Sequence, residues 1–322
     1  VYRESDDVER IAKAIENMEV RGAPAIGVMA ALGIAVAAYK SRSIDELLKN
    51  TDYAANRLWE TRPTAVNLFW AIERMKKFIR EKSREITDLD ELKKVIIDEA
   101  LKILNEDIEV NKRMGDIGAS LIEDGDTILT HCNAGAVATA GYGTALGVIR
   151  SAWRQGKKIK VIATETRPVL QGARLTVWEL VKEGIPVTLI TDNMVGYVMS
   201  KGLVSKVFVG ADRILLTGHV INKIGTYTIA VLAARHNVPF YAVAPTSTID
   251  PKSGVEDVVI EERDPDEVRK VLKKYLITVP NVPVLNPAFD ITPPELVTGI
   301  VTEKGIAYKP FEESLRKLLG LK

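Results

Sequence analysis

Apolar residues recur three and four positions apart over most of the first third of the chain. The spacing is clear around Ile11, Ile15 and Met18 and again in the stretch 66–75. This period is typical of amphipathic helices, whereas the alternation expected of strands is scarce in this part. We therefore predict a smaller, mainly helical domain over residues 1–117.

Two stretches of this helical part are informative on their own. Asp88 is the predicted N-cap of a long helix, because aspartate accepts hydrogen bonds from the free N–H groups of a first turn. The longest apolar stretch, residues 23–39, is interrupted by Pro24, Gly27 and Gly33. It is shorter than the roughly 20 residues that a bilayer span requires, so we expect no transmembrane helix.

After Asp126 short runs rich in β-branched residues alternate with helical patterns of about a dozen residues. Such alternation is typical of an α/β domain with a parallel sheet, and right-handed crossovers place its helices on both faces. For residues 118–322 we therefore predict a doubly wound parallel sheet. Its strands are predicted at residues 127–130, 159–163, 186–190, 206–209, 239–243 and 296–301.

Composition and charge limit the classes of function. The chain has 322 residues, with 44 lysines and arginines against 43 acidic residues, so its net charge of +1 provides no long-range field for nucleic acid or an anionic membrane. Cys132 is the only cysteine, and no cysteine or histidine cluster has the spacing of a metal site. The amino terminus carries no signal-peptide pattern. We expect a cytoplasmic enzyme without a metal, a nucleic-acid partner or a membrane contact.

Polar residues follow several of the predicted strands. Ligands bind at the carboxyl ends of the strands in doubly wound sheets, so these residues are expected to converge on one crevice. The segments are His131-Cys132-Asn133, Thr164-Glu165-Thr166-Arg167, Thr191-Asp192-Asn193 and Gly210-Ala211-Asp212-Arg213.

Cys132 and Asp212 are the leading catalytic candidates. Cys132 precedes the small residues 134–136, which we expect to open a helix whose N-terminus favours a thiolate. The alternative for Cys132 is a small buried hydrophobe. Asp212 follows an apolar strand, and partial desolvation there is expected to raise its pKa toward that of a useful base. The alternative for Asp212, and equally for Glu165 and Asp192, is ordinary turn capping.

Two arginines and a lysine suggest phosphate binding. Arg21 and Arg62 each precede an apolar helical stretch. Free N–H groups at a helix N-terminus together with a guanidinium group suit a phosphate, although a solvated arginine beside a turn is the alternative. Lys223 is expected to open the helix that runs to His236, and Gln171 to open another.

A dinucleotide site is a weaker reading. Gly141 and Gly143 precede a helical stretch, and Glu165 lies roughly 20 residues further on, as that fingerprint requires. The glycines come about ten residues after the strand instead of in its turn, so they cannot bring the backbone to a pyrophosphate. Close helix packing is the better explanation for them, and a Walker-type loop is absent from the sequence.

The motifs become more specific as a set. They are Arg-Gly-Ala-Pro-Ala-Ile-Gly at 21–27, Arg-Pro-Thr-Ala-Val-Asn-Leu at 62–68, Thr-His-Cys-Asn-Ala-Gly from 130, Thr-Glu-Thr-Arg-Pro from 164 with Gln-Gly-Ala-Arg at 171–174, Val-Gly-Ala-Asp-Arg-Ile from 209, Asn-Lys-Ile-Gly-Thr from 222 and Asn-Pro-Ala-Phe-Asp at 286–290. Together these motifs, which span nearly the whole chain, resemble those of the methylthioribose-1-phosphate isomerase family.

This resemblance implies isomerisation of 5-methylthioribose 1-phosphate to 5-methylthioribulose 1-phosphate in methionine salvage, a route of methionine biosynthesis. It also implies a Rossmann-like larger domain, a homodimer, and no metal or cofactor. By motif position Asp212 matches the proton donor, and Cys132 matches the residue credited with transition-state stabilisation or acid catalysis. The implied substrate-binding residues are Arg21, Gly22, Ala23, Arg62, Gln171, Asn222 and Lys223.

Alternatives stay open at this point. Ribose-1,5-bisphosphate isomerase is a related enzyme, but the apolar residues 24–27 after Arg21 suit a thiomethyl group better than a second phosphate. Regulatory subunits of the translation-initiation exchange complex share the fold without catalysis and need not keep both Cys132 and Asp212. Family members carry a further amino-terminal segment, so substrate closure and dimer contacts are open. The hydrogen moves from C2 to C1 either through an enediolate or as a hydride, which apolar walls favour.

Overall fold

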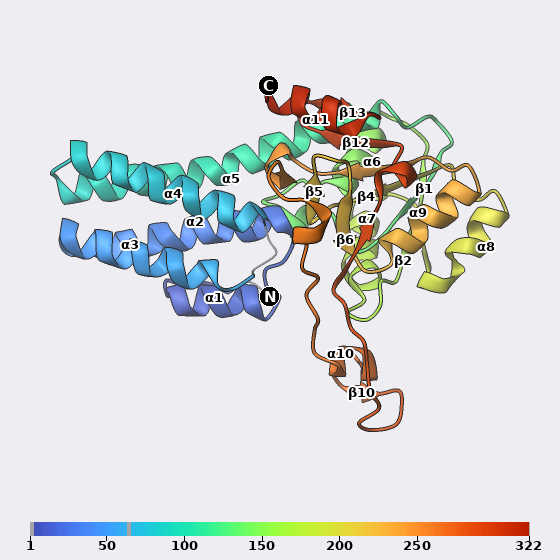
Figure 1. Ribbon diagram of the computed structural model, residues 1–322, viewed down its shortest axis with the longest axis horizontal. Coiled ribbons are helices and arrows are strands. Elements are labelled where there is room, and N and C mark those ends of the chain that lie inside the picture. Colours follow the sequence, from blue (N-terminus) through green and yellow to red (C-terminus); the bar gives the residue numbers. More distant parts are fainter. Residues whose placement is uncertain (1–2, 63–65, 322) are drawn as a thin grey trace. The chain divides into compact units, whose positions relative to one another are not determined.

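The computed structural model describes residues 3–62 and 66–321. It divides into two compact units, each of which is described by itself (Figure 1). The helical unit contains the chain up to residue 110 together with residues 137–141. The α/β unit contains residues 111–136 and the chain from residue 142 onward.

The helical unit is built around an apolar central helix. The helix α2 is long and apolar enough by composition to cross a membrane, but 72% of it is buried inside the protein, against α1, α3 and α4. Gly27 permits one close approach, because a Cβ there would lie 2.7 Å from the backbone oxygen of Asn67. Its burial identifies α2 as a core helix. The helices of this unit are α1 (Val8–Glu16), α2 (Ala23–Lys40), α3 (Ile44–Trp59), α4 (Val66–Glu85) and the first part of α5 (Leu89–Ala119), whose last residues, from 111 on, belong to the α/β unit.

Polar side chains define where several of these helices begin. Asp7 and Ser43 accept hydrogen bonds from first-turn N–H groups of α1 and α3. Asp88 does the same for α5, with its Oδ1 atom 2.8 Å from the backbone nitrogen of Glu91. The predicted cap at Asp88 is therefore confirmed.

The α/β unit contains a sheet of seven described strands in the order β13-β12-β7-β4-β1-β2-β3. All neighbours pair in parallel except β12 and β13, which are antiparallel. The predicted α/β fold class is confirmed. The strands are β1 (Thr127–Thr130), β2 (Lys160–Thr164), β3 (Val187–Ile190), β4 (Lys206–Val209), β7 (Phe240–Val243), β12 (Gly299–Thr302) and β13 (Gly305–Ala307).

Helices cover both faces of this sheet. Successive residues of a strand point to opposite sides of the sheet, so neighbouring residues pack against different helices. Ile128 and Phe208 belong to a core cluster with the carboxyl end of α5, with α6 and with α7. Leu129 and Val207 belong to the cluster with α8, α9 and α11. Besides α5, the helices that cover the sheet are α6 (Ala145–Arg154), α7 (Val177–Lys182), α8 (Val195–Ser200), α9 (Thr226–Arg235) and α11 (Phe311–Leu319).

A second, smaller sheet differs from what the sequence predicts. Its order is β11-β6-β5-β8, and β6 pairs antiparallel with both of its neighbours. Lys223 therefore ends a strand, and the expectation that it opens a helix is wrong, since α9 begins at Thr226. The strands are β5 (Arg213–Leu215), β6 (Val220–Lys223), β8 (Ile249–Asp250) and β11 (Phe289–Thr292).

Two further segments differ from the predicted elements. The last parallel strand begins at Gly299 instead of residue 296, because residues 294–296 form a 3₁₀ turn after Pro293. The short helix α10 (Asp266–Arg269) and the hairpin of β9 (Lys270–Val271) and β10 (Tyr275–Leu276) form a separate projection of the α/β unit (Figure 1).

Candidate active site

The strand order places a topological switch point between β1 and β4. The chain runs from β1 outward through β2 and β3 and then returns to form β4 on the other side of β1. In doubly wound sheets a crevice opens at such a point, outside the carboxyl ends of the strands, and ligands bind there.

Cys132 and Asp212 flank this switch point. Cys132 lies two residues after β1, and Asp212 lies three residues after β4. The loops that carry them touch, because a Cβ on Gly210 would lie 3.0 Å from the Cβ of Ala134. The backbone N–H of Asp212 donates to the carbonyl oxygen of Ile221 at 2.9 Å, which fixes Asp212 beside β6.

The backbone of Cys132 adopts an unusual conformation that its neighbours hold. Its φ of 60° lies in the left-handed region, which a residue other than glycine rarely adopts. The N–H of Cys132 donates to Thr166 Oγ1 at 2.8 Å, and its carbonyl oxygen accepts from Thr176 Oγ1 at 2.6 Å. Strained backbone of this kind persists only where the surrounding structure over-determines it.

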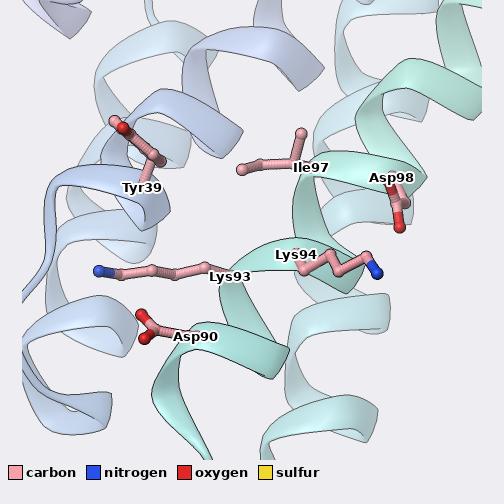
Figure 2. Close-up of a pocket in the computed structure, with 6 residues that line it drawn as sticks. All are labelled: Tyr39, Asp90, Lys93, Lys94, Ile97 and Asp98. Atoms are coloured by element: carbon pink, nitrogen blue, oxygen red, sulfur yellow. The ribbon is translucent and has the colours of Figure 1, made fainter.

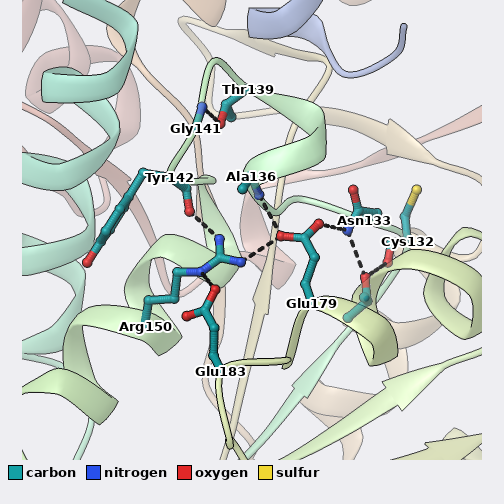
Figure 3. A network of polar contacts seen from close by, with 10 residues as sticks. Cys132, Asn133, Ala136, Thr139, Gly141, Tyr142, Arg150, Glu179 and Glu183 are labelled. Carbon is teal, nitrogen blue, oxygen red and sulfur yellow. Dashed lines mark hydrogen bonds and ion pairs between the residues drawn. The ribbon is translucent and has the colours of Figure 1, made fainter. Parts of the chain in front are cut away.

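The segment after Cys132 corrects one prediction. Residues 136–138 form only a single 3₁₀ turn, and the next helix, α6, begins at Ala145. The expected helix N-terminus beside the thiol is therefore not formed by residues 134–136. Instead, a buried carboxylate takes the N–H of Ala136, since Glu179 Oε2 accepts from it at 2.7 Å (Figure 3).

His131 connects the end of β1 to the end of β6. Its Nδ1 lies 2.6 Å from Thr164 Oγ1, and its Nε2 lies 2.9 Å from the carbonyl oxygen of Ile224. Burial lowers the pKa of His131, which outweighs its hydrogen bond to Ile224 and the attraction of Asp192. A neutral ring beside a carbonyl oxygen must carry its proton on Nε2, so Nδ1 accepts from the Thr164 hydroxyl.

Asn222 and Lys223 occupy the end of β6, close to this histidine. The side-chain amide of Asn222 donates to Thr226 Oγ1 at 2.9 Å. The ammonium group of Lys223 donates to the carbonyl oxygen of Ala288 at 2.8 Å and lies 4.5 Å from the centre of the Phe289 ring. The lysine side chain is thus held against the start of β11.

Sequence reasoning gave Asp290 no role, although it belongs to the quoted motif at 286–290. Its carboxylate accepts from the N–H groups of Gly225 and Tyr227, at 2.7 and 3.1 Å, and so caps α9. Burial raises the pKa of Asp290 to about 6, although both N–H groups and Lys223 favour the charged form. The motif at 286–290 could have pointed to Asp290, but the N–H groups that this carboxylate binds lie about 65 residues away in the sequence.

Gln171 lies seven residues after the end of β2 and directly precedes a π-helical turn, Gly172–Thr176, which continues into α7. The side chain is 4% exposed, and among the described residues its Oε1 atom has no hydrogen-bond partner. A buried acceptor left unpaired costs about 1–3 kcal/mol. This atom can accept a hydrogen bond from a bound molecule.

Glu165 and Asp192, the acidic residues that follow β2 and β3, differ in their surroundings. Asp192 accepts from the backbone N–H groups of Thr166 and Arg167 at 2.8 and 2.6 Å, which is the turn capping that the sequence left as an alternative. Burial and the charge of Asp192 raise the pKa of Glu165, and Arg167 opposes that shift.

The remaining predicted residues lie in the helical unit. Gly22, with a φ of 94°, directly precedes α2, whose first residue is Ala23. A Cβ on Gly22 would lie 2.3 Å from the carbonyl oxygen of Ala138, so this position requires glycine. Arg21 lies just before this turn, and Arg62 is the last described residue before 63–65. Those three residues of the second arginine motif lie outside the described part.

A separate open pocket of about 550 Å³ lies on the helical unit, between the end of α2 and the start of α5 (Figure 2). It contains none of the predicted site residues. Opposite charges line it, which leaves no net field for an ionic ligand. Its lining residues are Tyr39, Asp90, Lys93, Lys94, Ile97 and Asp98. In the described ranges 3–62 and 66–321, no three His, Cys, Asp or Glu side chains are grouped for a metal ion.

Comparisons with known proteins show the family of the chain. Residues 19–309 match the model of the initiation factor 2 subunit family. A protein from Thermotoga petrophila named methylthioribose-1-phosphate isomerase is 56% identical over 324 residues, which cover 99% of this chain and 92% of that protein. The chain belongs to the initiation factor 2 subunit family and groups there with the methylthioribose-1-phosphate isomerases.

Solved structures of family members bear two kinds of name. The 5-methylthioribose 1-phosphate isomerase of Pyrococcus horikoshii is 48% identical, with a TM-score of 0.90 over 98% of this chain and 88% of that one. A structure named translation initiation factor eIF-2B, subunit delta, from A. fulgidus is 51% identical, with a TM-score of 0.87 over 99% of this chain and 93% of that one. The curated relative at 56% identity, named an isomerase, favours the enzyme over the initiation-factor subunit.

Proposed function

We propose that this chain is an aldose–ketose isomerase that converts 5-methylthioribose 1-phosphate into 5-methylthioribulose 1-phosphate in methionine salvage. The observation that carries the proposal is the placement of Cys132 and Asp212 on adjacent loops at the switch point of the sheet. A thiol and a carboxylate at that point supply two titratable groups to one bound sugar. The relative from Thermotoga petrophila, 56% identical, is named for this activity.

The reaction opens one ring and moves one hydrogen. Because C1 carries a phosphate ester, the bond between C1 and the ring oxygen must break without a free aldehyde. Its electron pair goes to the ring oxygen, which takes a proton, while one hydrogen moves from C2 to C1 and the C2 hydroxyl loses its proton. We assign proton donation at the ring oxygen to Asp212 and stabilisation of the transition state to Cys132.

We assign substrate binding to the residues that match the family's motifs. Arg21 and Arg62 supply guanidinium groups, and the backbone of Gly22 and Ala23 supplies N–H groups at the start of α2, all suited to a phosphate. In the α/β unit Lys223 adds a positive charge. Gln171 and Asn222 provide amides for sugar hydroxyl groups, and the buried Oε1 of Gln171 supports that role.

We further propose that the enzyme is a cytoplasmic homodimer that uses no metal or cofactor and needs no nucleic acid or membrane. The net charge of +1 supports the last two points, because it provides no field for polyanions. The single cysteine, which cannot form an internal disulfide, is compatible with a reducing compartment.

The test is a direct comparison of substrates with the purified chain. We expect turnover of 5-methylthioribose 1-phosphate with a kcat/KM at least about tenfold above that for ribose 1,5-bisphosphate, because an apolar pocket rejects a second phosphate. A preference for the bisphosphate would reassign the substrate. Turnover of neither sugar would favour the role of an initiation-factor subunit, the name that the A. fulgidus relative carries.

A further inference from the structure

The loop that carries Cys132 contains a buried ionic network that the proposed chemistry does not use. Glu179 lies at its centre, on α7, and is 3% exposed. Its Oε1 atom accepts from the side-chain amide of Asn133 at 2.9 Å, and its Oε2 atom accepts from the backbone N–H of Ala136 at 2.7 Å (Figure 3). The two residues flanking the middle of the loop are thus bound to one carboxylate.

The loop wraps closely around this carboxylate. A Cβ on Gly135 would lie 2.3 Å from Glu179 Oε2 and 2.4 Å from Oε1, so the backbone between Asn133 and Ala136 packs directly on both oxygens. Gly143 packs in turn on Gly135, since its Cβ would lie 2.7 Å from the Gly135 backbone. Any rotation of the carboxylate therefore displaces the loop.

Arg150 supplies the opposite charge. Its Nη2 atom donates to Glu179 Oε2 at 2.6 Å, and the two side chains are 4% and 2% exposed. The same guanidinium donates to the carbonyl oxygen of Tyr142, where the chain returns from the loop, and to Glu183. Glu183 is 31% exposed and, within the described part of the chain, makes no hydrogen bond to the loop, so it neutralises only the outer side of the arginine.

The network reaches Cys132 through Thr176, which lies one helical turn before Glu179. Thr176 Oγ1 donates to the carbonyl oxygen of Cys132 at 2.6 Å and accepts from the amide of Asn133 at 3.2 Å. Thr176 and Glu179 therefore bind the carbonyl of Cys132 and two groups that follow it, the Asn133 amide and the Ala136 N–H. This is the support that a residue with a φ of 60° needs.

We propose that Glu179, with Arg150 and Thr176, is a positioning device for Cys132. These residues set the place of the thiol by holding the backbone on its carboxyl side, and they take no part in proton transfer. The inference rests on the proposed function only for its kinetic consequence. The geometric part concerns the thiol alone, and Cys132 is the only cysteine in the chain.

The experiment compares Glu179→Gln with Glu183→Gln. Both variants remove one negative charge beside Arg150, but only the first touches the loop. A misplacement of about 1 Å can cost on the order of 100-fold in rate. We expect Glu179→Gln to lower kcat on that order while KM changes less than about threefold, and Glu183→Gln to stay within about threefold of the wild type in both.

The second readout is the rate at which iodoacetamide alkylates Cys132 in the folded protein. Loosening the loop exposes the half-buried thiol, so we expect alkylation of Glu179→Gln to be at least about threefold faster than that of the wild type and of Glu183→Gln. Equal alkylation rates in all three proteins would overturn the proposal. An equal kcat loss in both variants would also overturn it, because the charge of Arg150 alone would then be responsible.

Thr176 provides the same test if Glu179→Gln does not fold. Thr176→Val removes only the hydroxyl group, and Thr176→Ser restores it. Faster alkylation and lower kcat in the valine variant, with recovery in the serine variant, support the positioning role, whereas unchanged alkylation contradicts it. If the chain has no isomerase activity at all, the alkylation rates still decide the geometric claim, so the two failures are distinguishable.

Discussion

Thr166 Oγ1 accepts a hydrogen bond of 2.8 Å from the backbone N–H of Cys132. The bond joins the ends of the adjacent strands β1 and β2, and both residues have φ values near 60°. Two strained residues thus support each other at the carboxyl edge of the sheet. Because Thr166 is fully buried, water cannot take the place of its hydroxyl group as the acceptor for the Cys132 N–H.

Replacement of this hydroxyl group is expected to affect catalysis and stability together. Thr166→Val keeps the shape of the side chain but leaves the Cys132 N–H without its acceptor, which costs about 1–3 kcal/mol. We expect a matching loss in the free energy of unfolding and a lower kcat. Thr166→Ser, which keeps the acceptor, should recover most of both. A valine variant as active and as stable as the serine variant would show that this bond is dispensable.

The raised pKa of Asp290 predicts a specific dependence of stability on pH. The folded pKa is about 6 and the ordinary value is 3.8, so between these values the folded state binds more protons than the unfolded state. Asp290 therefore adds stability at low pH, which is lost as the pH rises through about 6. The difference amounts to about 3 kcal/mol at most.

The measurement compares denaturant unfolding of the wild type and Asp290→Asn from pH 4 to pH 7. The stability of the wild type relative to the variant should decline across this range, since asparagine does not titrate. A relative stability that stays constant or rises with pH would contradict the burial-driven shift.

His131 should act in the opposite direction. Burial lowers its pKa below 6.5, so the unfolded state binds the proton first as the pH falls. Its contribution to stability is therefore complete above about pH 6.5 and declines below it. The His131→Gln variant should show a smaller loss of stability between pH 7 and pH 5 than the wild type. If both proteins lose the same amount, His131 is not held neutral in the fold.

The close packing around Gly172 predicts that a side chain at this position would disturb the turn that follows Gln171. A Cβ at this position would lie 1.8 Å from the carbonyl oxygen of Thr164, a backbone atom that cannot rotate away as a flexible side chain could. We expect Gly172→Ala to lower the free energy of unfolding by at least about 2 kcal/mol. Gly196→Ala in α8 is the control, because its Cβ would meet only Leu232 side-chain atoms at 3.6 Å or more. A neutral Gly172→Ala, measured by thermal unfolding, would contradict the close approach.

The strands of the main sheet that pair in parallel are predictable because each is a short apolar run, whereas the antiparallel strand β13 was not among the predicted strands. The order in which they pair, and hence the switch point, depends on contacts that no local pattern records. Glu179 illustrates the limit: its bond to Ala136 spans 43 positions in the sequence. In the sequence it is one glutamate among the polar positions of a helix.

The incorrect prediction of a helix after Cys132 also results from a partner that is distant in the sequence. Residues 134–136 are small enough for a helix, but the carboxylate of Glu179 takes the N–H of Ala136 and holds the segment as a loop. The motif at 222–226 suggested the binding residues Asn222 and Lys223, but nothing in the sequence indicated that Asp290 accepts a hydrogen bond from Gly225. Local sequence indicates which residues carry chemistry, and distant partners decide how they are held.

The central claim is that Cys132 and Asp212 carry out an isomerisation at the switch point of this sheet. The most direct measurement is the steady-state conversion of 5-methylthioribose 1-phosphate by the wild type, Cys132→Ser and Asp212→Asn, with binding of the sugar phosphate measured in parallel. We predict turnover by the wild type, a loss of at least about 100-fold in each variant, and little change in binding. Wild-type rates in either variant, or no turnover by the unmodified chain, would contradict the claim.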